Sequence, residues 1–270
     1  MSPSQNYGQA EYWDERYERD ESDPFDWLVE YADISELLSE LIKKDDDILM
    51  TGCGNAPFSV DMHLAGYTNI TNIDISSVVI GQQSDKYPQM KWLVMDVHNL
   101  SFENESISVI LDKSLIDTVL CYSNSVEWTH RMIQELYRVL KPNGRFITLS
   151  LHSKADIACF FQLPQYDWTV SFYEILNPRW DQWCNSRRSM THTLIICEKH
   201  KKDPKDKGIL KLNHVLTDKE IILLKTLHLK VNSDKMIKLA STQDLLNSLD
   251  EALLSSVTPQ NLDKLERVAS

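Results

Sequence analysis

Residues 48–56 read Ile48-Leu49-Met50-Thr51-Gly52-Cys53-Gly54-Asn55-Ala56, a short apolar run that ends in two glycines. The chain holds only 7 glycines in 270 residues, so two so close together are notable. Glycine has no Cβ and accepts positive φ, which lets the backbone turn tightly beside a ligand. A helix that follows such a turn points its N-terminus at the loop. The stretch predicts either a ligand-binding loop or an ordinary strand-to-helix turn, and the residues downstream decide between them.

The composition is that of a globular protein, with 42% hydrophobic and 25% charged residues. The length allows one large α/β domain, with or without an appendage. The net charge of −12 and the pI of about 5.1 argue against non-specific binding to nucleic acid or to an anionic membrane, and favour a basic partner.

The cysteines and histidines indicate no metal site. The 5 cysteines are widely spaced without a C-x-x-C pair, so neither a disulfide framework nor a zinc site is expected. The 8 histidines show no ligand spacing.

The N-terminus has no apolar leader region and no run of 18 apolar residues occurs. We expect a cytoplasmic protein, with the nucleus as a second location.

Strand-like and helix-like segments alternate along residues 33–151. Helices are expected over 33–43, opened by a capping box at Asp33–Glu36, after Pro57, after Ser76 as N-cap, and over 124–140. Strands are expected at 48–51, 70–74, 91–95, 107–111 and 145–151. Two further β-rich runs, 168–176 and 193–197, have no clear helix between them and predict an antiparallel hairpin. The class is α/β: a doubly wound, mostly parallel seven-stranded sheet, with its ligand crevice at the carboxyl ends of the strands.

Changes in composition divide the chain. Residues 1–10 are polar and predicted to be disordered. Residues 11–199 form the main domain, residues 200–208 a charged linker, and residues 209–270 a mainly helical C-terminal extension that packs on the domain or offers a surface to a partner. Six aromatic residues interleaved with charges lie within 11–31. They predict either packing against the edge of the domain or a lid over a pocket.

Acidic residues lie at the ends of three expected strands: Asp74, Asp96 and Asp112. Asp74 comes 20 residues after Gly54, at the distance where a carboxylate binds the hydroxyls of a ribose. Pro57 occupies the third glycine position of the dinucleotide fingerprint, so that fingerprint fails. Asp96, preceded by the apolar Met95, suits the amino group and the face of an adenine. A Gly-x-Gly loop with these two acids, in this order, is the arrangement that binds S-adenosylmethionine.

Several stretches carry a resemblance to a known family: Tyr12-Trp13-Asp14-Glu15-Arg16-Tyr17, Phe25-Asp26-Trp27, Gly52-Cys53-Gly54-Asn55, Asn72-Ile73-Asp74-Ile75-Ser76 with Val78-Val79-Ile80, Met95-Asp96 and Leu111-Asp112-Lys113. In them the chain resembles the class I (seven-β-strand) S-adenosylmethionine-dependent methyltransferases. More narrowly, it resembles the branch of lysine methyltransferases that act on translation elongation factor 1-alpha. The resemblance covers about residues 10–199 and makes 11–199 a methyltransferase domain.

The resemblance implies a set of site residues. Those expected to contact the cofactor are Trp13, Arg16, Gly52, Cys53, Gly54, Asn55, Asp74, Ile75, Asp96, Val97 and Asp112. Asp112 is also the expected catalytic residue, facing the methyl group and orienting the incoming amine. The acceptor is expected near Tyr17, Trp27, Lys113 and, from its place at a strand end, His152. No metal is expected.

Three departures from the usual family pattern concern the same sites. Met50 stands where an acid usually precedes the glycines, although the branch commonly has an apolar residue there. Ala56 stands where Gly or Ser is usual, and Ser114-Leu115-Ile116-Asp117 stands where the branch tends to have Gly-Thr-Leu-Asp. The resemblance implies methylation of a protein lysine, with a basic protein as partner. Two alternatives stay open: methylation of a small molecule or RNA, and a degenerate methyltransferase-fold scaffold that binds a partner through residues 200–270.

Overall fold

The computed structural model describes residues 7–19, 26–176, 191–201, 209–210 and 237–238, and the chain divides into two compact units, 1–201 and 202–270. In the second unit the described residues form one antiparallel pair, β8 (Ile209–Leu210) with β9 (Ile237–Lys238). The predicted linker from residue 202 onward and most of the predicted helical extension lie outside the described residues.

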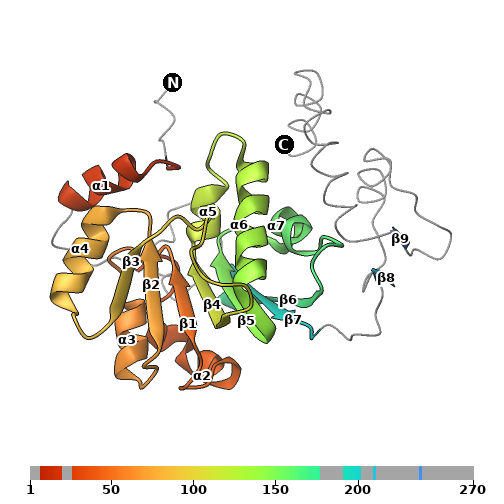
Figure 1. The fold of residues 1–270 in the computed structure, drawn as a ribbon, viewed down its shortest axis with the longest axis horizontal. Helices are drawn as coiled ribbons and strands as arrows, with labels where there is room; N and C mark the ends of the chain where they lie inside the picture. The colour runs from red at the N-terminus through yellow and green to blue at the C-terminus, as the bar shows by residue number, and fades with distance from the viewer. Residues whose placement is uncertain (1–6, 20–25, 177–190, 202–208, 211–236, 239–270) are drawn as a thin grey trace. The chain divides into compact units, whose positions relative to one another are not determined.

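A seven-stranded sheet forms the centre of the first unit, in the order β3-β2-β1-β4-β5-β7-β6 (Figure 1). Its strands are β1 (Ile48–Thr51), β2 (Ile70–Asp74), β3 (Lys91–Val94), β4 (Ile107–Lys113), β5 (Leu140–Ser150), β6 (Trp168–Leu176) and β7 (Thr191–Lys199). The first five strands are parallel, and β7 runs antiparallel to both β5 and β6. The predicted mostly parallel sheet with a terminal antiparallel hairpin is confirmed.

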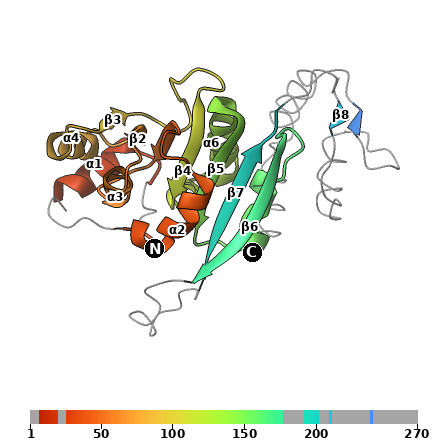
Figure 2. The ribbon, with the colours of Figure 1, turned by 90° about the horizontal axis from the view of Figure 1, so that it is seen from below.

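Seven helices are described in this unit: α1 (Ala10–Arg19), α2 (Tyr31–Leu41), α3 (Phe58–Leu64), α4 (Ser77–Lys86), α5 (Leu115–Val119), α6 (Ser125–Val139) and α7 (Lys154–Phe161). Figures 1 and 2 show them on both sides of the sheet. Since neighbouring strand residues point to opposite faces, β1 contributes side chains to a hydrophobic core on each face of the sheet. Ile48 and Met50 pack with α2 and α3, while Leu49 packs with α5 and α6.

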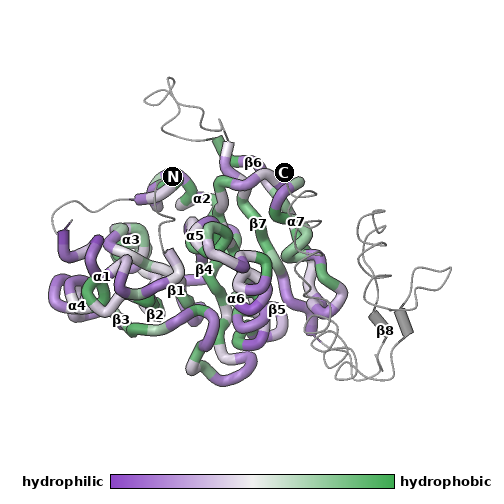
Figure 3. Tube along the Cα trace, turned by 90° about the horizontal axis from the view of Figure 1, so that it is seen from above, coloured by the Kyte–Doolittle hydropathy of each residue, from purple (hydrophilic) through white to green (hydrophobic). Residues whose placement is uncertain are grey.

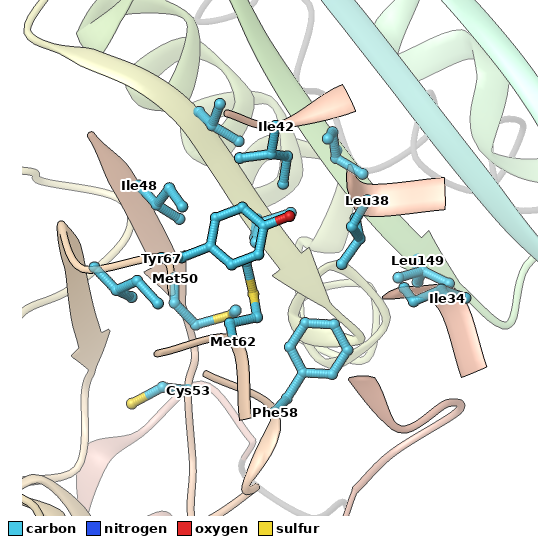
Figure 4. Packing of buried hydrophobic residues seen from close by; sticks show 14 of the residues in the cluster. Ile34, Leu38, Ile42, Ile48, Met50, Cys53, Phe58, Met62, Tyr67 and Leu149 are labelled. Carbon is cyan, nitrogen blue, oxygen red and sulfur yellow. The ribbon is translucent and has the colours of Figure 1, made fainter. Parts of the chain in front are cut away.

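The core on the α2–α3 face closes around Tyr67 and Met62, both fully buried, with Leu38, Ile42 and Ile48 beside them (Figure 4). The hydropathy of the backbone tube shows the apolar residues of β4 and β7 in the interior (Figure 3). Burial of these side chains stabilises the layered fold by roughly 1.5–3 kcal/mol for each large apolar residue. The cores leave the carboxyl ends of β1–β4 for the site.

Some boundaries differ from the sequence expectation. Helix α2 begins at Tyr31, and its capping box joins Glu30 and Asp33, because the Glu30 N–H donates to Asp33 Oδ2 over 2.7 Å. Strand β5 begins at Leu140, with a register shift opposite Ile107–Val109, where the sequence predicted a turn over 141–144. Tyr7–Gln9 form a turn into α1, so the predicted disorder over residues 1–10 is wrong from Tyr7 onward.

Two short helices were not predicted from the sequence. Helices α5 and α7 were not expected, because each has at most eight residues and shows too little periodicity. The apolar side chains of Leu64 and Val126 are 76% and 58% exposed. Among the described residues, no helix is long and apolar enough to cross a bilayer. In the same residues no group of His, Cys, Asp or Glu could hold a metal ion.

Candidate functional site

A cavity of about 250 Å³ lies at the carboxyl ends of β1–β4, where the sequence predicted a crevice. Its walls come from the loop after β1, the ends of β2 and β4, the segment after β3, and helices α1 and α5. Most of the predicted site residues line it: Trp13, Arg16, Tyr17, Trp27, Gly52, Cys53, Gly54, Asn55, Asp74, Ile75, Asp96, Val97 and Lys113. Asp112 and His152 do not.

The glycine loop forms the floor of this cavity. Gly52 and Gly54 have φ of 57° and 53°, in the left-handed region that costs other residues free energy. A Cβ on Gly52 would lie 3.0 Å from Leu115 Cδ1, and a Cβ on Gly54 would lie 2.8 Å from the hydroxyl oxygen of Tyr17. Both glycines are therefore required, one for its contact with α5 and one for its contact with α1.

Asp74 joins the glycine loop to the end of β2. Its Oδ2 accepts a 2.9 Å hydrogen bond from the Gly54 N–H, and its Oδ1 accepts one of 3.0 Å from the Ser76 N–H. Burial raises the pKa of this carboxyl group, while the amide donors act in the opposite direction. The carboxylate is thus held rigidly in the cavity wall.

Asp96 faces the cavity after β3 and is held by His98. The His98 N–H donates to Asp96 Oδ1 over 2.9 Å, and the imidazole Nδ1 lies 2.7 Å from the same oxygen. Burial alone would raise the pKa of Asp96, but its hydrogen bonds and charge interactions with His98 lower it. His98 also lines the cavity and is only 6% exposed. The only signal for this role in the sequence is the position of His98 two residues after the acid.

Helix α1 forms one wall of the cavity and is tied to the N-terminus of α4. Asp14 Oδ1 accepts hydrogen bonds from Ser76 Oγ and from the Val78 N–H, the latter over 3.2 Å. The carboxylate is well placed there, because a helix N-terminus favours negative charge. Asp14 lay in a stretch that carried the resemblance, yet no role was predicted for it.

The aromatic residues of the N-terminal region both pack together and line the cavity. The ring centroids of Trp13 and Tyr17 are 6.1 Å apart in a stacked arrangement. The Arg16 guanidinium lies 5.4 Å from the ring centroid of Trp13 and 5.6 Å from that of Trp27. All four residues line the cavity. The sequence predicted that this segment either packs against the domain or forms a lid over a pocket. The same residues therefore both pack against one another and line the cavity.

Lys113 forms a buried ion pair in the opposite wall. Its Nζ lies 2.5 Å from Asp26 Oδ1 and donates to the Trp27 carbonyl oxygen over 3.0 Å. The two side chains are 8% and 3% exposed. Removing one partner of such a pair costs several kcal/mol, because the other charge stays buried. Lys113 thus links the end of β4 to Trp27 at the cavity, and its predicted role toward an acceptor stays a prediction.

Asp112, the predicted catalytic residue, lies outside the lining of the cavity. Its side chain is 1% exposed and lies inside the fold rather than on the cavity. Oδ1 accepts from the Leu115 N–H over 2.8 Å, and Oδ2 accepts from Thr148 Oγ1 over 2.8 Å and from the Ile116 N–H over 3.3 Å. Burial raises the pKa of Asp112 to about 7 despite these donors. The carboxyl group caps the first turn of α5 and joins it to β5.

The acid that does reach the cavity from this region is Asp117. It lies one turn further along α5 and is bound by the end of β5, with Ser150 Oγ 2.5 Å from Oδ1. His152 does not line the cavity, but its Nε2 lies 3.9 Å from Asp117 Oδ1. The only sequence signal for Asp117 was its place at the end of the Ser114–Asp117 segment.

Comparison with known proteins gives a consistent picture. Residues 49–148 match a family described as "Methyltransferase domain". The chain is 32% identical over 176 residues to EEF1A lysine methyltransferase 4 of Mus musculus, covering 61% of this chain and 69% of the relative. It is 34% identical over 182 residues to the eEF1A lysine and N-terminal methyltransferase of Homo sapiens, covering 64% of this chain and 26% of the relative.

Solved structures share the fold at low identity. Geranyl diphosphate C-methyltransferase from Streptomyces coelicolor, in complex with S-adenosyl-L-homocysteine, superposes with a TM-score of 0.54 at 13% identity. The match covers 74% of this chain and 99% of that one. The described sheet and helices therefore have the architecture found in that enzyme.

Proposed function

The chain belongs to the S-adenosylmethionine-dependent methyltransferase family that includes the EEF1A lysine methyltransferases, and we propose that it methylates a lysine side chain of a protein, with elongation factor 1-alpha as the first candidate. It is an enzyme that uses S-adenosylmethionine as methyl donor. The observation that carries the proposal is the cavity at the strand ends, which combines a Gly-x-Gly floor, two acids after neighbouring strands and an aromatic wall.

The cavity fits the methyl donor. At Gly52 and Gly54 a Cβ would lie within 3.0 Å of the facing wall, so side chains there would fill the space beside the loop. We place the methionine part of the donor against residues 52–55. The Asp74 carboxylate accepts hydrogen bonds from the amides of Gly54, Ile75 and Ser76. Since a carboxylate has about four acceptor sites, Asp74 retains acceptor capacity for the ribose.

The segment after β3 suits the adenine. Asp96 is 45% exposed on its side chain and directs Oδ1 to His98, which leaves Oδ2 for the exocyclic amine. The depressed pKa keeps this carboxylate ionised at neutral pH. Met95 and Val97 line the cavity beside it and supply apolar surface for the ring.

The reaction mainly requires that the lysine nitrogen be aligned with the methyl group and that water be excluded. When bound, the donor supplies an electrophilic methyl group: the lysine nitrogen lone pair forms the new N–C bond, and the C–S bond breaks with its electron pair staying on sulfur. The ammonium must first lose a proton, since its ordinary pKa is about 10.4.

The aromatic side chains of Trp13, Tyr17 and Trp27 line the cavity. Lys113 holds Trp27 in place by donating a hydrogen bond to the carbonyl oxygen of Trp27. The net charge of −12 suits approach of a basic protein surface.

Labelling tests the proposal. The purified full chain is incubated with methyl-labelled S-adenosylmethionine and either purified elongation factor 1-alpha or a cell lysate, and the labelled residue is identified by mass spectrometry. We expect label on a protein lysine. Label confined to RNA or to a small molecule would contradict the proposal, and so would an absence of any label despite cofactor binding measured by calorimetry.

Two matched variants show whether the label comes from this site. Asp74→Ala should weaken binding of S-adenosylmethionine by at least about 100-fold, because the ribose and the Gly54 amide lose a charged acceptor. Asp85→Ala removes an exposed acid on α4, outside the cavity, and should bind the cofactor as the unmodified chain does.

A further inference from the structure

Three acids are found among the described residues that line the cavity: Asp74, Asp96 and Asp117. The first two follow β2 and β3, on one side of β1 in the sheet order. Asp117 comes from α5, which follows β4, and is hydrogen-bonded to the end of β5, on the other side of β1. The proposed binding of the methyl donor uses the first two acids and leaves Asp117 without a role.

The backbone around Asp117 is arranged to bring its carboxylate to this wall. Ser114 has a φ of 68°, in the left-handed region, and its N–H donates to the Leu149 carbonyl oxygen over 3.0 Å. Asp112 caps the turn that follows. A left-handed residue other than glycine costs free energy, so this turn is stabilised by its surroundings rather than by local preference.

Donors on two elements hold the Asp117 carboxylate. Oδ1 accepts from Ser150 Oγ and Oδ2 accepts from Ser114 Oγ, the latter over 2.9 Å. The Leu151 N–H lies 3.2 Å from both oxygens. A carboxylate held only by donors is suited to the ionised form, and each of its oxygens can accept more than one hydrogen bond. Burial raises the pKa of Asp117, but its hydrogen bonds and the nearby His152 oppose that effect.

We propose that Asp117 binds the ε-amino nitrogen of the substrate lysine and holds it beside the methyl donor, an inference that rests on the proposed lysine methylation. The position fits, because the cavity-lining Leu151, whose N–H binds Asp117, is 50% exposed and marks an open edge of the site. Lys113, in the same wall, already has Asp26 as its ionic partner.

The charge of Asp117 is useful at two stages of the reaction. Before transfer it attracts the lysine ammonium, which releases one proton to water. During transfer the nitrogen lone pair forms the N–C bond, the C–S electron pair stays on sulfur, and the positive charge moves from sulfur to nitrogen. A fixed carboxylate beside the nitrogen stabilises that developing charge, and it needs no reorganisation to do so.

A purely structural role for Asp117, joining α5 to β5, makes a different prediction. Asp117→Asn removes the charge and keeps the side-chain size. If Asp117 binds the amine, this variant should bind S-adenosylmethionine within about threefold of the unmodified chain and should lose about 100-fold in kcat/KM for the protein lysine. Asp117→Glu keeps the charge but displaces it, and should recover part of that loss. Asp85→Asn, with the same substitution on an exposed face, should match the unmodified chain.

The measurements are thermal unfolding, calorimetric titration with S-adenosylmethionine, and kcat/KM with elongation factor 1-alpha or with whichever lysine-bearing protein the lysate labelling identifies. Asp117→Asn with unchanged kcat/KM would overturn the inference, and so would parallel losses of stability, cofactor affinity and activity in both Asp117 variants. An unmodified chain that labels no protein lysine would instead refute the proposed function, before any variant is compared.

Discussion

The backbone N–H of Gly54 donates a 2.9 Å hydrogen bond to Oδ2 of Asp74, which joins the turn after β1 directly to the carboxyl end of β2. The same turn is joined to β2 by the Cys53 N–H, which donates to the Ile73 carbonyl oxygen over 3.0 Å. The glycine loop and the acid 20 residues later are thus one rigid unit, and a change in either should be felt in the binding of the methyl donor.

Gly54→Ala tests this unit. Alanine at a φ of 53° costs roughly 1–2 kcal/mol, and its Cβ would meet the Tyr17 hydroxyl at 2.8 Å. We expect the free energy of unfolding to fall by about that amount and the dissociation constant for S-adenosylmethionine to rise at least about tenfold, both measured on the full chain.

Adding Tyr17→Phe to Gly54→Ala separates the two causes. Loss of the hydroxyl removes the contact with the new Cβ but leaves the backbone strain, so the double variant should recover part of the cofactor affinity and little of the stability. Recovery of both quantities would show that the positive φ at residue 54 carries no cost.

Asp14→Ala should weaken cofactor binding through α1. This helix has no fully buried residue, so its position depends on a few polar contacts, among them those of Asp14 with Ser76 and Val78. We expect faster hydrogen exchange over residues 10–19 and a loss of about tenfold in affinity for S-adenosylmethionine, since a hydrogen bond to a charged group contributes about 1.5–3 kcal/mol.

Glu15→Ala is the matched control for Asp14→Ala, because Glu15 is an exposed acid on the same helix. It should change neither the hydrogen exchange nor the affinity. If the two variants behave alike, α1 does not depend on Asp14 for its place at the cavity.

Asp112 should control how stability depends on pH. Its pKa is about 7 in the folded chain against an ordinary 3.8, so the folded state binds more protons than the unfolded state between these values. The free energy of unfolding contributed by Asp112 therefore falls as pH rises from about 4 to about 7 and is constant above that. Asp112→Asn should reduce this slope, measured by denaturant unfolding at several pH values.

The same variant tests the structural role of Asp112. Asparagine replaces one acceptor oxygen by an NH2 group, which leaves a donor of α5 or β5 without its partner and should lower stability by roughly 1–3 kcal/mol below pH 7, while affinity for S-adenosylmethionine stays within about threefold. Unchanged stability together with lost turnover would restore the role that the sequence alone had suggested, a catalytic carboxylate.

The elements of the sheet could be read from the sequence because they depend on local pattern. Strand β1 was predicted at its observed bounds, Ile48–Thr51, and Ser76 was predicted as the N-cap of α4, where its hydroxyl accepts from the Val79 N–H. Gly52, Gly54, Asp74 and Asp96 followed from these strand ends, since a residue just after a buried parallel strand emerges at one edge of the sheet.

The different positions of Asp112 and Asp117 show what the sequence pattern cannot supply. Side chains alternate between faces along a strand, so the acid at the end of β4 points into the fold while Lys113 points to the cavity. The turn that carries Asp117 outward depends on the positive φ of Ser114 and on a hydrogen bond to Leu149, which is distant in sequence. Neither the positive φ nor this hydrogen bond produces a hydrophobic periodicity that could be read from the sequence of a five-residue helix.

Strand β7 follows β6 in the chain but lies between β5 and β6 in the sheet, so β5 has no partner on its outer edge until β7 has been synthesised. The glycine loop, Asp74 and Asp96 all emerge from the ribosome within the first hundred residues. Ser150, which holds Asp117, sits on a strand whose outer edge is paired only once Thr193–Glu198 have been synthesised. The residues proposed to bind the methyl donor are thus synthesised well before the strand that completes the surroundings of Asp117, the residue proposed to bind its target.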